Sequence, residues 1–286
     1  MATLFLCQMP VSHAQDYSGP LYDAHAHFPR GTDPTFIQTL YQKAGIAKAV
    51  LFVRLSDAAE AARLAATLGP DFLLFADAHK GRKKGRYRVD LQRLARFETG
   101  LDAGTVKGFG ELYWTLGKSP FAPNGLQTDF DRAEEADLLR LAAARGLAVH
   151  IHDENLSSED LARIKAYPQV TFILAHAGYQ SPERLAALFA AHDNLYAELS
   201  LISNAHFGPF KGNPPLKVAP SSAWLGVLSQ WSTRFLVGSD IGANAKRMAM
   251  LPQIMSDYRR LLGHLPKDVA ENIAYRNFER LFLSPR

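Results

Sequence analysis

Two closely spaced histidines are the first residues in the chain that could perform chemistry. His25 and His27 follow a short apolar lead-in, Leu21-Tyr22, and stand two residues apart. Alternate side chains on an extended strand share a face, so we expect both imidazoles to point the same way. Two imidazoles on one face, where a strand runs out into a loop, suit a single ion of the zinc type.

Later apolar segments also end in residues that bind metals. Their terminal histidines and carboxylates are Glu111, His152, His176 and Asp240. Chance rarely produces such a set, because histidine is an uncommon residue. The single cysteine, Cys7, excludes both an internal disulfide and a multi-cysteine zinc site, so the predicted ligands are histidines and carboxylates.

These residue types predict hydrolytic chemistry. Neutral imidazoles and carboxylates leave a divalent ion with an open position for a water molecule, whose pKa the ion lowers towards about 7. Asp240 would orient that water, accept its proton and pass it to the leaving group. The ion or His176 would polarise the substrate oxygen.

Eight apolar segments of strand character alternate with helical patterns along the chain. The predicted strands are residues 21–28, 47–53, 72–76, 105–112, 147–152, 170–176, 195–200 and 234–240. The predicted helices are residues 34–45, 57–68, 88–102, 129–145, 158–167, a helix opened by Pro182, 221–231, and most of 243–262 and 267–282. Strict alternation implies parallel strands, and eight repeats predict a closed α/β fold, the (β/α)8 TIM barrel. Its active site lies at the carboxyl ends of the strands, where we also expect the long loops 113–128 and 202–220.

The barrel is predicted to form a single domain, residues 21–286, because no change in composition marks a second one. Residues 1–20 form an N-terminal segment in which Ser12-His13-Ala14 resembles a signal-peptidase site, although a positively charged leader is missing. The protein is expected in the periplasm or outside the cell if residues 1–14 act as a signal peptide, and otherwise in the cytoplasm. No apolar run approaches the roughly 20 residues that span a bilayer, so no membrane partner is expected.

The net charge of the chain is +4 at pH 7, and the excess is local. Residues 79–88 form a basic block, which we expect to be a solvated loop that could draw an anionic small-molecule substrate towards the site. Nucleic-acid binding is disfavoured, because only Tyr87 interleaves these charges and bases would have little to stack on.

The ordered set of motifs resembles the amidohydrolase superfamily of metal-dependent barrel hydrolases. Asp23-Ala24-His25-Ala26-His27 resembles its first-strand His-x-His motif, and Val237-Gly238-Ser239-Asp240 resembles its eighth-strand Gly-Ser-Asp. Residues 148–152 and 174–178 are similar to the fifth- and sixth-strand histidine motifs, and 271–282 resembles the final helix of the amidohydrolase-2 branch. The resemblance implies a hydrolase with one or two divalent ions, zinc being the expected metal, and barrels of this kind often form homodimers.

The fourth strand departs from the common pattern of the superfamily. Many binuclear members have a carboxylated lysine there, whereas Lys107 stands early in this strand and is expected to be structural. Glu111 stands at its end and resembles the fourth-strand glutamate of the TatD-like branch. As a ligand, Glu111 would bridge two ions. Otherwise the site would hold one ion, and Glu111 would contact the substrate or support the ligands.

Several further residues could contact the substrate or support the site. The candidate substrate contacts follow strands or lie in a long loop, and they are His79, Tyr113, Trp114 and His206. Glu198 and Ser200 share a face of the seventh strand and could reach the mouth. His150 is expected to pack against a helix.

The predicted function is a metal-dependent hydrolase of a small ester, lactone, amide or phosphoester, with Asp240 as general acid and base. A non-hydrolytic decarboxylase (a lyase) is the nearest alternative, because the amidohydrolase-2 branch includes decarboxylases that use the same ligands. A TatD-like nuclease is a third hypothesis, favoured by Glu111. A catalytically silent metal-binding protein is the least favoured, because it would not need an open metal position.

Overall fold

The fold is described from a computed structural model. It covers residues 15–54, 57–77, 79–83, 86–89, 91–116, 126–127, 132–242 and 244–284. The predicted signal segment, residues 1–14, and most of the predicted loop 113–128 lie outside these described residues. Across the described part of the chain, every helix falls short of the length and hydropathy that crossing a membrane requires.

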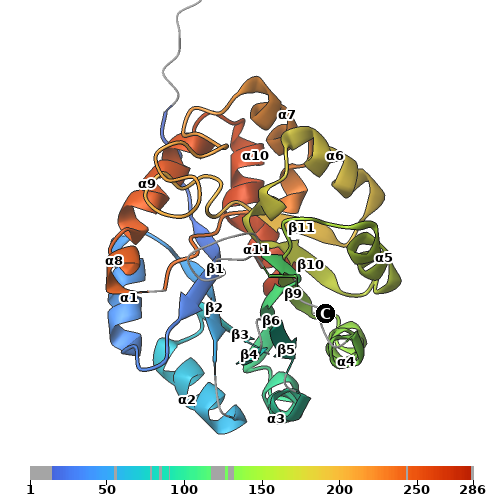
Figure 1. The fold of residues 1–286 in the computed structure, drawn as a ribbon. Helices are drawn as coiled ribbons and strands as arrows, with labels where there is room; N and C mark the ends of the chain where they lie inside the picture. Colours follow the sequence, from blue (N-terminus) through green and yellow to red (C-terminus); the bar gives the residue numbers. More distant parts are fainter. Residues whose placement is uncertain are drawn as a thin grey trace, which may run out of the picture.

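Eight parallel strands stand at the centre of the molecule and follow one another in chain order (Figure 1). They are β1 (Tyr22–Phe28), β2 (Lys48–Val53), β3 (Phe72–Ala76), β6 (Val106–Tyr113), β9 (Ala148–His152), β10 (Thr171–Leu174), β11 (Leu195–Glu198) and β12 (Phe235–Leu236). The ring closes where Ala26 bridges to Ile241 and the His27 N–H donates to the Ile241 carbonyl at 2.8 Å. The predicted single-domain (β/α)8 barrel is therefore confirmed. Each strand begins within one residue of its predicted start, but β10, β11 and β12 end two to four residues before their predicted ends.

Helices surround the strands (Figure 1). They are α1 (Pro34–Lys43), α2 (Ala58–Leu68), α3 (Leu91–Asp102), α4 (Arg132–Ala144), α5 (Ser158–Ala166), α6 (Pro182–Ala191), α7 (Ser222–Gln230), α8 (Ala245–Met248), α9 (Leu251–Leu262), α10 (Lys267–Glu271) and α11 (Asn277–Phe282). Side-chain caps fix where several begin, at Asp33, Asp57, Ser157, Ser181 and Ser221. The pattern over 267–282 is helical as predicted, with a π-helical turn between α10 and α11.

Two small antiparallel pairs follow strands of the barrel. β4 (His79–Lys83) pairs with β5 (Arg86–Val89) after β3, and β7 (Thr115–Leu116) pairs with β8 (Leu126–Gln127) after β6. The prediction that residues 79–88 form a loop was therefore wrong. Pairing within a hairpin satisfies backbone groups that a loop would leave to water, and the sequence offers no strong turn signal to reveal it.

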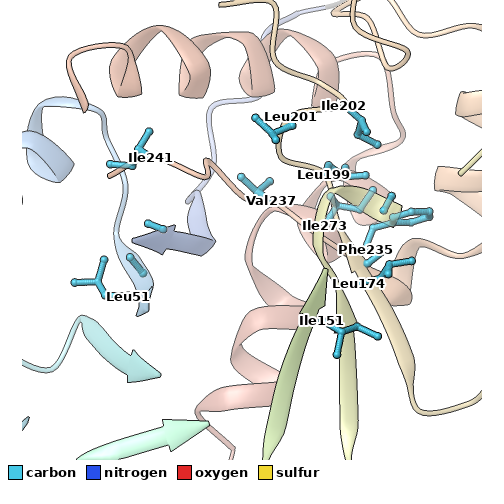
Figure 2. Close-up of a cluster of buried hydrophobic side chains, with 14 of the residues drawn as sticks. Leu51, Ile151, Leu174, Leu199, Leu201, Ile202, Phe235, Val237, Ile241 and Ile273 are labelled. Atoms are coloured by element: carbon cyan, nitrogen blue, oxygen red, sulfur yellow. The ribbon is translucent and has the colours of Figure 1, made fainter. Parts of the chain in front are cut away.

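Two apolar cores hold the barrel together. The outer core fills the space between strands and helices and includes Leu51, Ile151, Leu174 and Phe235 (Figure 2). The inner core fills the barrel with side chains from the opposite face of the strands, among them Tyr22, Val50, Leu73, Phe75, Ile173 and Leu236. Phe278 and Phe282 of α11 join this inner core, with rings 5.2 Å from that of Tyr22 and 5.4 Å from that of Phe75. Tyr22 opens β1, so α11 closes the amino-terminal end and leaves the carboxyl end to polar residues.

A break in register changes the direction in which the side chains of β1 point. The pairing of β1 with β2 shifts between Asp23 and Ala26. Ala24 consequently belongs to the inner core and Ala26 to the outer core, although residues two apart on a regular strand share a face. Such bulges re-aim side chains next to active sites. His25, within the bulge, and His27, after it, therefore both contribute ligand-type atoms to one group at the mouth of the barrel.

A second break in register changes the direction of side chains on β6. Its pairing with β9 shifts between Phe109 and Leu112. Gly110 faces the interior, where an added Cβ would stand 2.9 Å from Cβ of His150. The next residue, Glu111, also faces the interior, and so a carboxylate reaches the cluster described below.

Candidate metal centre

The carboxyl ends of the strands bring the six predicted ligands together. They form two groups of ligand-type atoms, each group lying within 4.8 Å: a first group of His25, His27 and Asp240, and a second group of Glu111, His152 and His176. Only His27 keeps substantial exposure, with 33% of its side chain accessible. The cluster is therefore buried with one open side.

The first group has the spacing of ligands around one ion. Nε2 of His25 lies 3.4 Å from Nε2 of His27 and 3.4 Å from Oδ1 of Asp240, and the distance from His27 to Asp240 is 3.2 Å. Ligands about 2.0–2.1 Å from a tetrahedral zinc ion stand about 3.3–3.4 Å from one another. The donor atoms present therefore fit an ion of the zinc type.

Glu111 faces both groups with different oxygens. Oε2 lies 3.8 Å from Nε2 of His25 and 3.7 Å from Nε2 of His27. Oε1 lies 2.8 Å from Nδ1 of His152 and 3.5 Å from Nε2 of His176. An ionised carboxylate has about four lone-pair sites on its two oxygens, so one glutamate can serve two ions.

Two of the predicted ligands stand on strained backbone. φ is +56° at His176 and +51° at Asp240, in the left-handed region that residues other than glycine rarely adopt. The His176 N–H donates to Oε1 of Glu198 at 2.6 Å, and the Asp240 N–H donates to the His25 carbonyl at 2.8 Å. Strain of this kind costs of order 1–3 kcal/mol per residue and concentrates at functional sites.

A buried carboxylate joins the first strand to the last beneath the cluster. Asp23 accepts hydrogen bonds from the Ser239 hydroxyl at 2.6 Å, the Ser239 N–H at 2.9 Å, the Tyr41 hydroxyl at 3.0 Å and the His25 N–H at 3.2 Å. Burial raises the pKa of Asp23 to about 6, and these hydrogen bonds limit the rise. Asp23 was not predicted for this role, although its place two residues before His25 was a signal.

The ionisable groups of the cluster strongly affect one another. Burial alone would lower the pKa of His152, but Glu111 outweighs burial and raises it to about 9. Burial also opposes protonation of His25, yet Glu198 and Glu111 hold its pKa well above the usual value. Burial would raise the pKa of Glu111, whereas His152 and His25 hold it well below the usual range. A cation would compete with these histidine protons, so metal binding is expected to release protons.

His150 lies inside the barrel next to the cluster. Its ring centroid lies 4.8 Å from that of Phe52, 5.6 Å from that of Phe75 and 5.9 Å from that of His25. The prediction that it packs against a helix was wrong, because residues two apart on a strand share a face and His152 points inward. Burial lowers the pKa of His150 to about 3, which keeps the ring neutral.

Tyr113 and Trp114 follow the same strand but lie in different environments. Tyr113 is half-buried, and its ring lies 5.3 Å from that of His152, at the cluster. Trp114 is buried outside the barrel, 5.9 Å from the ring of Phe172 and under the guanidinium of Arg163 at 4.9 Å. Neighbours on a strand face opposite ways, so only Tyr113 is placed to contact a substrate.

His206, predicted to contact the substrate, and Lys107, expected to be structural, do not join the cluster in the part of the chain that the structure describes. His206, in the loop 202–220, lies with Nε2 2.9 Å from Oδ2 of Asp257 on α9. Lys107 lies at the amino-terminal end of β6, with Nζ 3.4 Å from where a Cβ of Gly104 would stand. The backbone of His79 begins β4, and its side chain lies outside the described residues.

Two residues that the sequence patterns did not indicate complete the surroundings of the cluster. Tyr179 stacks on His176 with ring centroids 5.5 Å apart and lies 5.4 Å from Phe210, which places the loop 202–220 at the mouth. Glu154 lies with Oε1 3.1 Å from Nε2 of His152, on the side opposite Glu111. A carboxylate that holds the outer nitrogen of a histidine is a common support for a metal ligand.

The comparison with protein families agrees with this geometry. A family model of the amidohydrolase-2 type, described as amidohydrolase, matches residues 22–226. The chain belongs to the amidohydrolase family. The match includes five of the six predicted ligands and ends before Asp240, which the structure places beside His25 and His27. The comparison with curated protein sequences gave no match.

Solved structures of similar fold span almost the whole amidohydrolase. A probable 2-pyrone-4,6-dicarboxylic acid hydrolase from Acinetobacter baumannii with citric acid bound is 12% identical, with a TM-score of 0.58 over 93% of this chain and 100% of that one. A TatD homologue from Escherichia coli is 16% identical, with a TM-score of 0.58 over 93% and 98% of the two chains. An amidohydrolase from Burkholderia multivorans with bound zinc is 15% identical, with a TM-score of 0.55 over 93% and 100%. At these identities the likeness establishes the shared fold, and the TatD-like role of Glu111 stays a prediction.

Proposed function

We propose that the amidohydrolase is a metal-dependent hydrolase of a small ester, lactone, amide or phosphoester. The observation that supports this most directly is the first group, His25, His27 and Asp240, whose ligand atoms lie 3.2–3.4 Å apart at the carboxyl end of the barrel. Three protein ligands are typical of catalytic zinc sites, which keep a further position open for water or substrate.

The donor atoms favour zinc in two positions. Imidazole nitrogens and carboxylate oxygens are ordinary zinc ligands, and the amidohydrolase from Burkholderia multivorans has bound zinc. The first group would hold one ion, and the second group would hold another through Glu111, which faces both. When bound, such ions polarise a carbonyl or phosphoryl oxygen and lower the pKa of a water molecule towards about 7.

Asp240 is the residue proposed to move the proton. Burial would raise its pKa, but hydrogen bonding to His25 and His27 holds the pKa below the usual range, so the group is an ionised carboxylate at neutral pH. Oδ1 faces the two histidines, and Oδ2 would accept the proton of the attacking water and pass it to the leaving group. His176 would assist in polarising the substrate oxygen, and Tyr113 would border the substrate.

An arginine-lined cavity lies at the carboxyl ends of β1 and β2, and although none of the six candidate ligands lines it, its charge suits an anionic group on a substrate. The cavity has a volume of about 280 Å³, and its lining includes Arg30 after β1, Arg54 after β2, and Arg63 and Glu60 on α2. Arg54 also pairs with Asp77 at 2.7 Å, which offsets part of its charge and leaves Arg30 and Arg63 as the further cations of the lining. Guanidinium groups bind carboxylate and phosphate through several N–H groups at once. A carboxylate or phosphate on the substrate is therefore part of the proposal.

Metal analysis combined with activity measurements tests the proposal. The protein is purified without chelator, its divalent metals are quantified, and hydrolysis of lactones, esters, amides and phosphoesters is measured. The assays are repeated after EDTA treatment and after zinc is returned. We expect turnover that is lost with the metal and restored by it. Protein that binds no divalent ion, or that hydrolyses the panel equally well without metal, would refute the proposal.

Two further assays on the same preparations separate the alternative activities. Carbon dioxide release from an aromatic acid would indicate a decarboxylase that uses the same ligands. Cleavage of single-stranded DNA would indicate a TatD-like nuclease, which the position of Glu111 between the two groups favours. Bound metal without turnover of any of these substrates would indicate a silent metal-binding protein.

A further inference from the structure

A second buried carboxylate lies behind the candidate metal ligands, on the seventh strand. Glu198 ends β11 and is fully buried. Oε1 accepts hydrogen bonds from the His176 N–H at 2.6 Å and the Ser200 hydroxyl at 2.9 Å, and it lies 3.0 Å from Nδ1 of His25. Oε2 accepts from the Ser200 N–H at 2.7 Å. Both oxygens of Glu198 are therefore engaged by groups that donate hydrogen.

The contact with Glu198 decides which nitrogen of His25 can bind a metal. An ionised carboxylate offers only acceptors, so Nδ1 of His25 must keep its hydrogen to bond to it. Nε2 is then the nitrogen that offers a lone pair, and it is the atom that lies 3.4 Å from Nε2 of His27 and 3.4 Å from Oδ1 of Asp240. Carboxylates that hold the outer nitrogen of a metal-binding histidine fix both its tautomer and its orientation.

Ser200 provides the closer of two contacts that carry the same constraint to His176, because Nδ1 of His176 also lies 3.4 Å from Oε1 of Glu198. The Ser200 hydroxyl has one hydrogen, and it donates that hydrogen to Oε1 of Glu198. The Ser200 oxygen must then accept a hydrogen from Nδ1 of His176, which lies 2.7 Å away. Nε2 of His176 is left to offer its lone pair on the side of Glu111, whose Oε1 lies at 3.5 Å.

We propose that Glu198 is a positioning residue for both candidate ions. It fixes His25 of the first group directly and His176 of the second group through Ser200, so one carboxylate prepares two ion positions. The inference rests on the proposed metal-dependent function and adds a residue that is not itself a ligand.

An ion bound to Glu198 itself is the competing interpretation, because His25, His176 and Glu198 also form a group of closely spaced ligand atoms. Such an ion would lie on the Nδ1 side of both rings and displace two hydrogens, the one that Nδ1 of His25 donates to Glu198 and the one that Nδ1 of His176 donates to Ser200. The two backbone N–H groups on Glu198, from His176 and Ser200, cannot give up their hydrogens. The hydrogen-bonded arrangement therefore fits Glu198 better than a metal does.

Glu198→Gln tests the role of the carboxylate. The neutral amide keeps the shape but cannot accept from all four donors, so we expect the affinity for zinc, measured by chelator competition, to fall by about 10–100-fold. Glu135→Gln is a matched control, because Glu135 is another buried carboxylate, on α4 and outside the cluster. It is expected to leave the zinc affinity unchanged.

Ser200→Ala separates the effect of Glu198 on His176 from its effect on His25. It removes the hydroxyl between Glu198 and His176 but leaves the contact to His25, so we expect only the second ion to bind more weakly. In nitrogen-15 NMR spectra of zinc-loaded wild type, we expect hydrogen on Nδ1 and metal on Nε2 at both histidines. In Ser200→Ala, only His176 is expected to depart from this pattern.

The outcomes distinguish the inference from the proposed function. Wild type that binds no divalent ion would defeat both. Wild type that binds zinc, with Glu198→Gln binding it equally well, would overturn the inference alone. Metal found on Nδ1 of His25 or His176 in the wild type would favour the competing ion on Glu198 and overturn it as well. Should Glu198→Gln fail to fold, the wild-type spectra and Ser200→Ala decide.

Discussion

Oδ1 of Asp240 lies 3.2 Å from Nε2 of His27, across the seam where the last strand of the barrel meets the first. Closure of the barrel brings the two side chains together. The His27 N–H bonds to the Ile241 carbonyl and the Asp240 N–H bonds to the His25 carbonyl, each at 2.8 Å. The geometry of the first ion position is therefore a direct result of closing the ring.

Asp240→Asn is expected to separate metal binding from turnover. The amide oxygen can still face the histidines, but the side chain can no longer accept a proton from water. We expect kcat to fall by about 10²–10⁴-fold, the usual contribution of a positioned acid or base, while metal content and unfolding temperature stay close to those of the wild type. Activity near that of the wild type would remove Asp240 from the mechanism.

Glu111→Ala is expected to change the number of bound ions. Wild-type protein should hold two zinc ions per chain, and the variant at most one, because the second group would retain only His152 and His176. The measurement is metal content after dialysis against buffered zinc, with Glu135→Gln as the control. A wild type that binds a single ion would instead favour a mononuclear site and a supporting role for Glu111.

Gly238→Ala is expected to damage the site by crowding. An added Cβ would collide with Oε2 of Glu198 and stand 3.2 Å from Cβ of His25. Overpacking of this kind typically costs about 1–3 kcal/mol, so the free energy of unfolding should fall by that amount and the zinc affinity should fall with it.

Gly226→Ala is the matched control for that substitution. Gly226 lies within α7, and a Cβ there would have no neighbour within 4 Å. Replacing a helical glycine by alanine stabilises by about 0.5–1 kcal/mol. A Gly238→Ala variant that is as stable as Gly226→Ala and binds zinc normally would contradict the packing described for Glu198.

Glu135 is expected to make stability depend on pH. Burial raises its pKa from 4.5 to about 7, although Arg163 lies 3.7 Å away and acts in the opposite direction. The folded state then binds more protons than the unfolded state between these values, so this group's contribution to stability falls as the pH rises from about 4.5 to 7. At about 1.4 kcal/mol per pKa unit, the loss between these two pKa values is roughly 3–4 kcal/mol.

Urea unfolding of wild type and Glu135→Gln at several pH values measures this effect. Glutamine does not titrate, so the difference in unfolding free energy between the two proteins should move in favour of the variant between pH 5 and pH 8. Other groups affect both proteins alike and cancel in the difference. A difference that is constant across this range would show that Glu135 titrates normally.

Arg30→Ala is expected to affect anionic substrates selectively. Loss of a hydrogen bond to a charged group costs about 1.5 kcal/mol, so KM for a carboxylate or phosphate substrate should rise roughly tenfold with little change in kcat. Neutral substrates should be unaffected. Arg184→Ala, which removes an exposed arginine from α6, should change neither value. Equal effects on charged and neutral substrates would argue against an anionic substrate.

The hydrophobic pattern predicted the strands because burial on both faces requires continuous apolar runs. It also predicted the six residues that cluster, because each stands at the end of such a run. It could not show which way every side chain points. Trp114 faces outward, and its position in the sequence three residues after Glu111 does not indicate this orientation.

Features that depend on local irregularity were beyond reach of the sequence. The bulge in β1 between Asp23 and Ala26 and the left-handed backbone at His176 and Asp240 depend on long-range hydrogen bonds, which no local pattern specifies. The role of Asp23 depends on Ser239 and Tyr41, which lie far from it in the sequence or on another element and donate hydrogen bonds to its carboxylate.

The short last strand has a consequence for the whole molecule. β12 contributes only Phe235–Leu236 to the sheet, so beyond that point the joint with β1 depends on a few hydrogen bonds and on the side chains gathered at the mouth. A cation bound by His25, His27 and Asp240 would link the first strand of the barrel to the segment that follows the last strand. Ligands that bind only the native state add to its stability by mass action. Metal binding would thus stabilise the barrel as well as complete the site. The metal-free protein is expected to open first at the joint between β12 and β1, which is also where the candidate ligands lie.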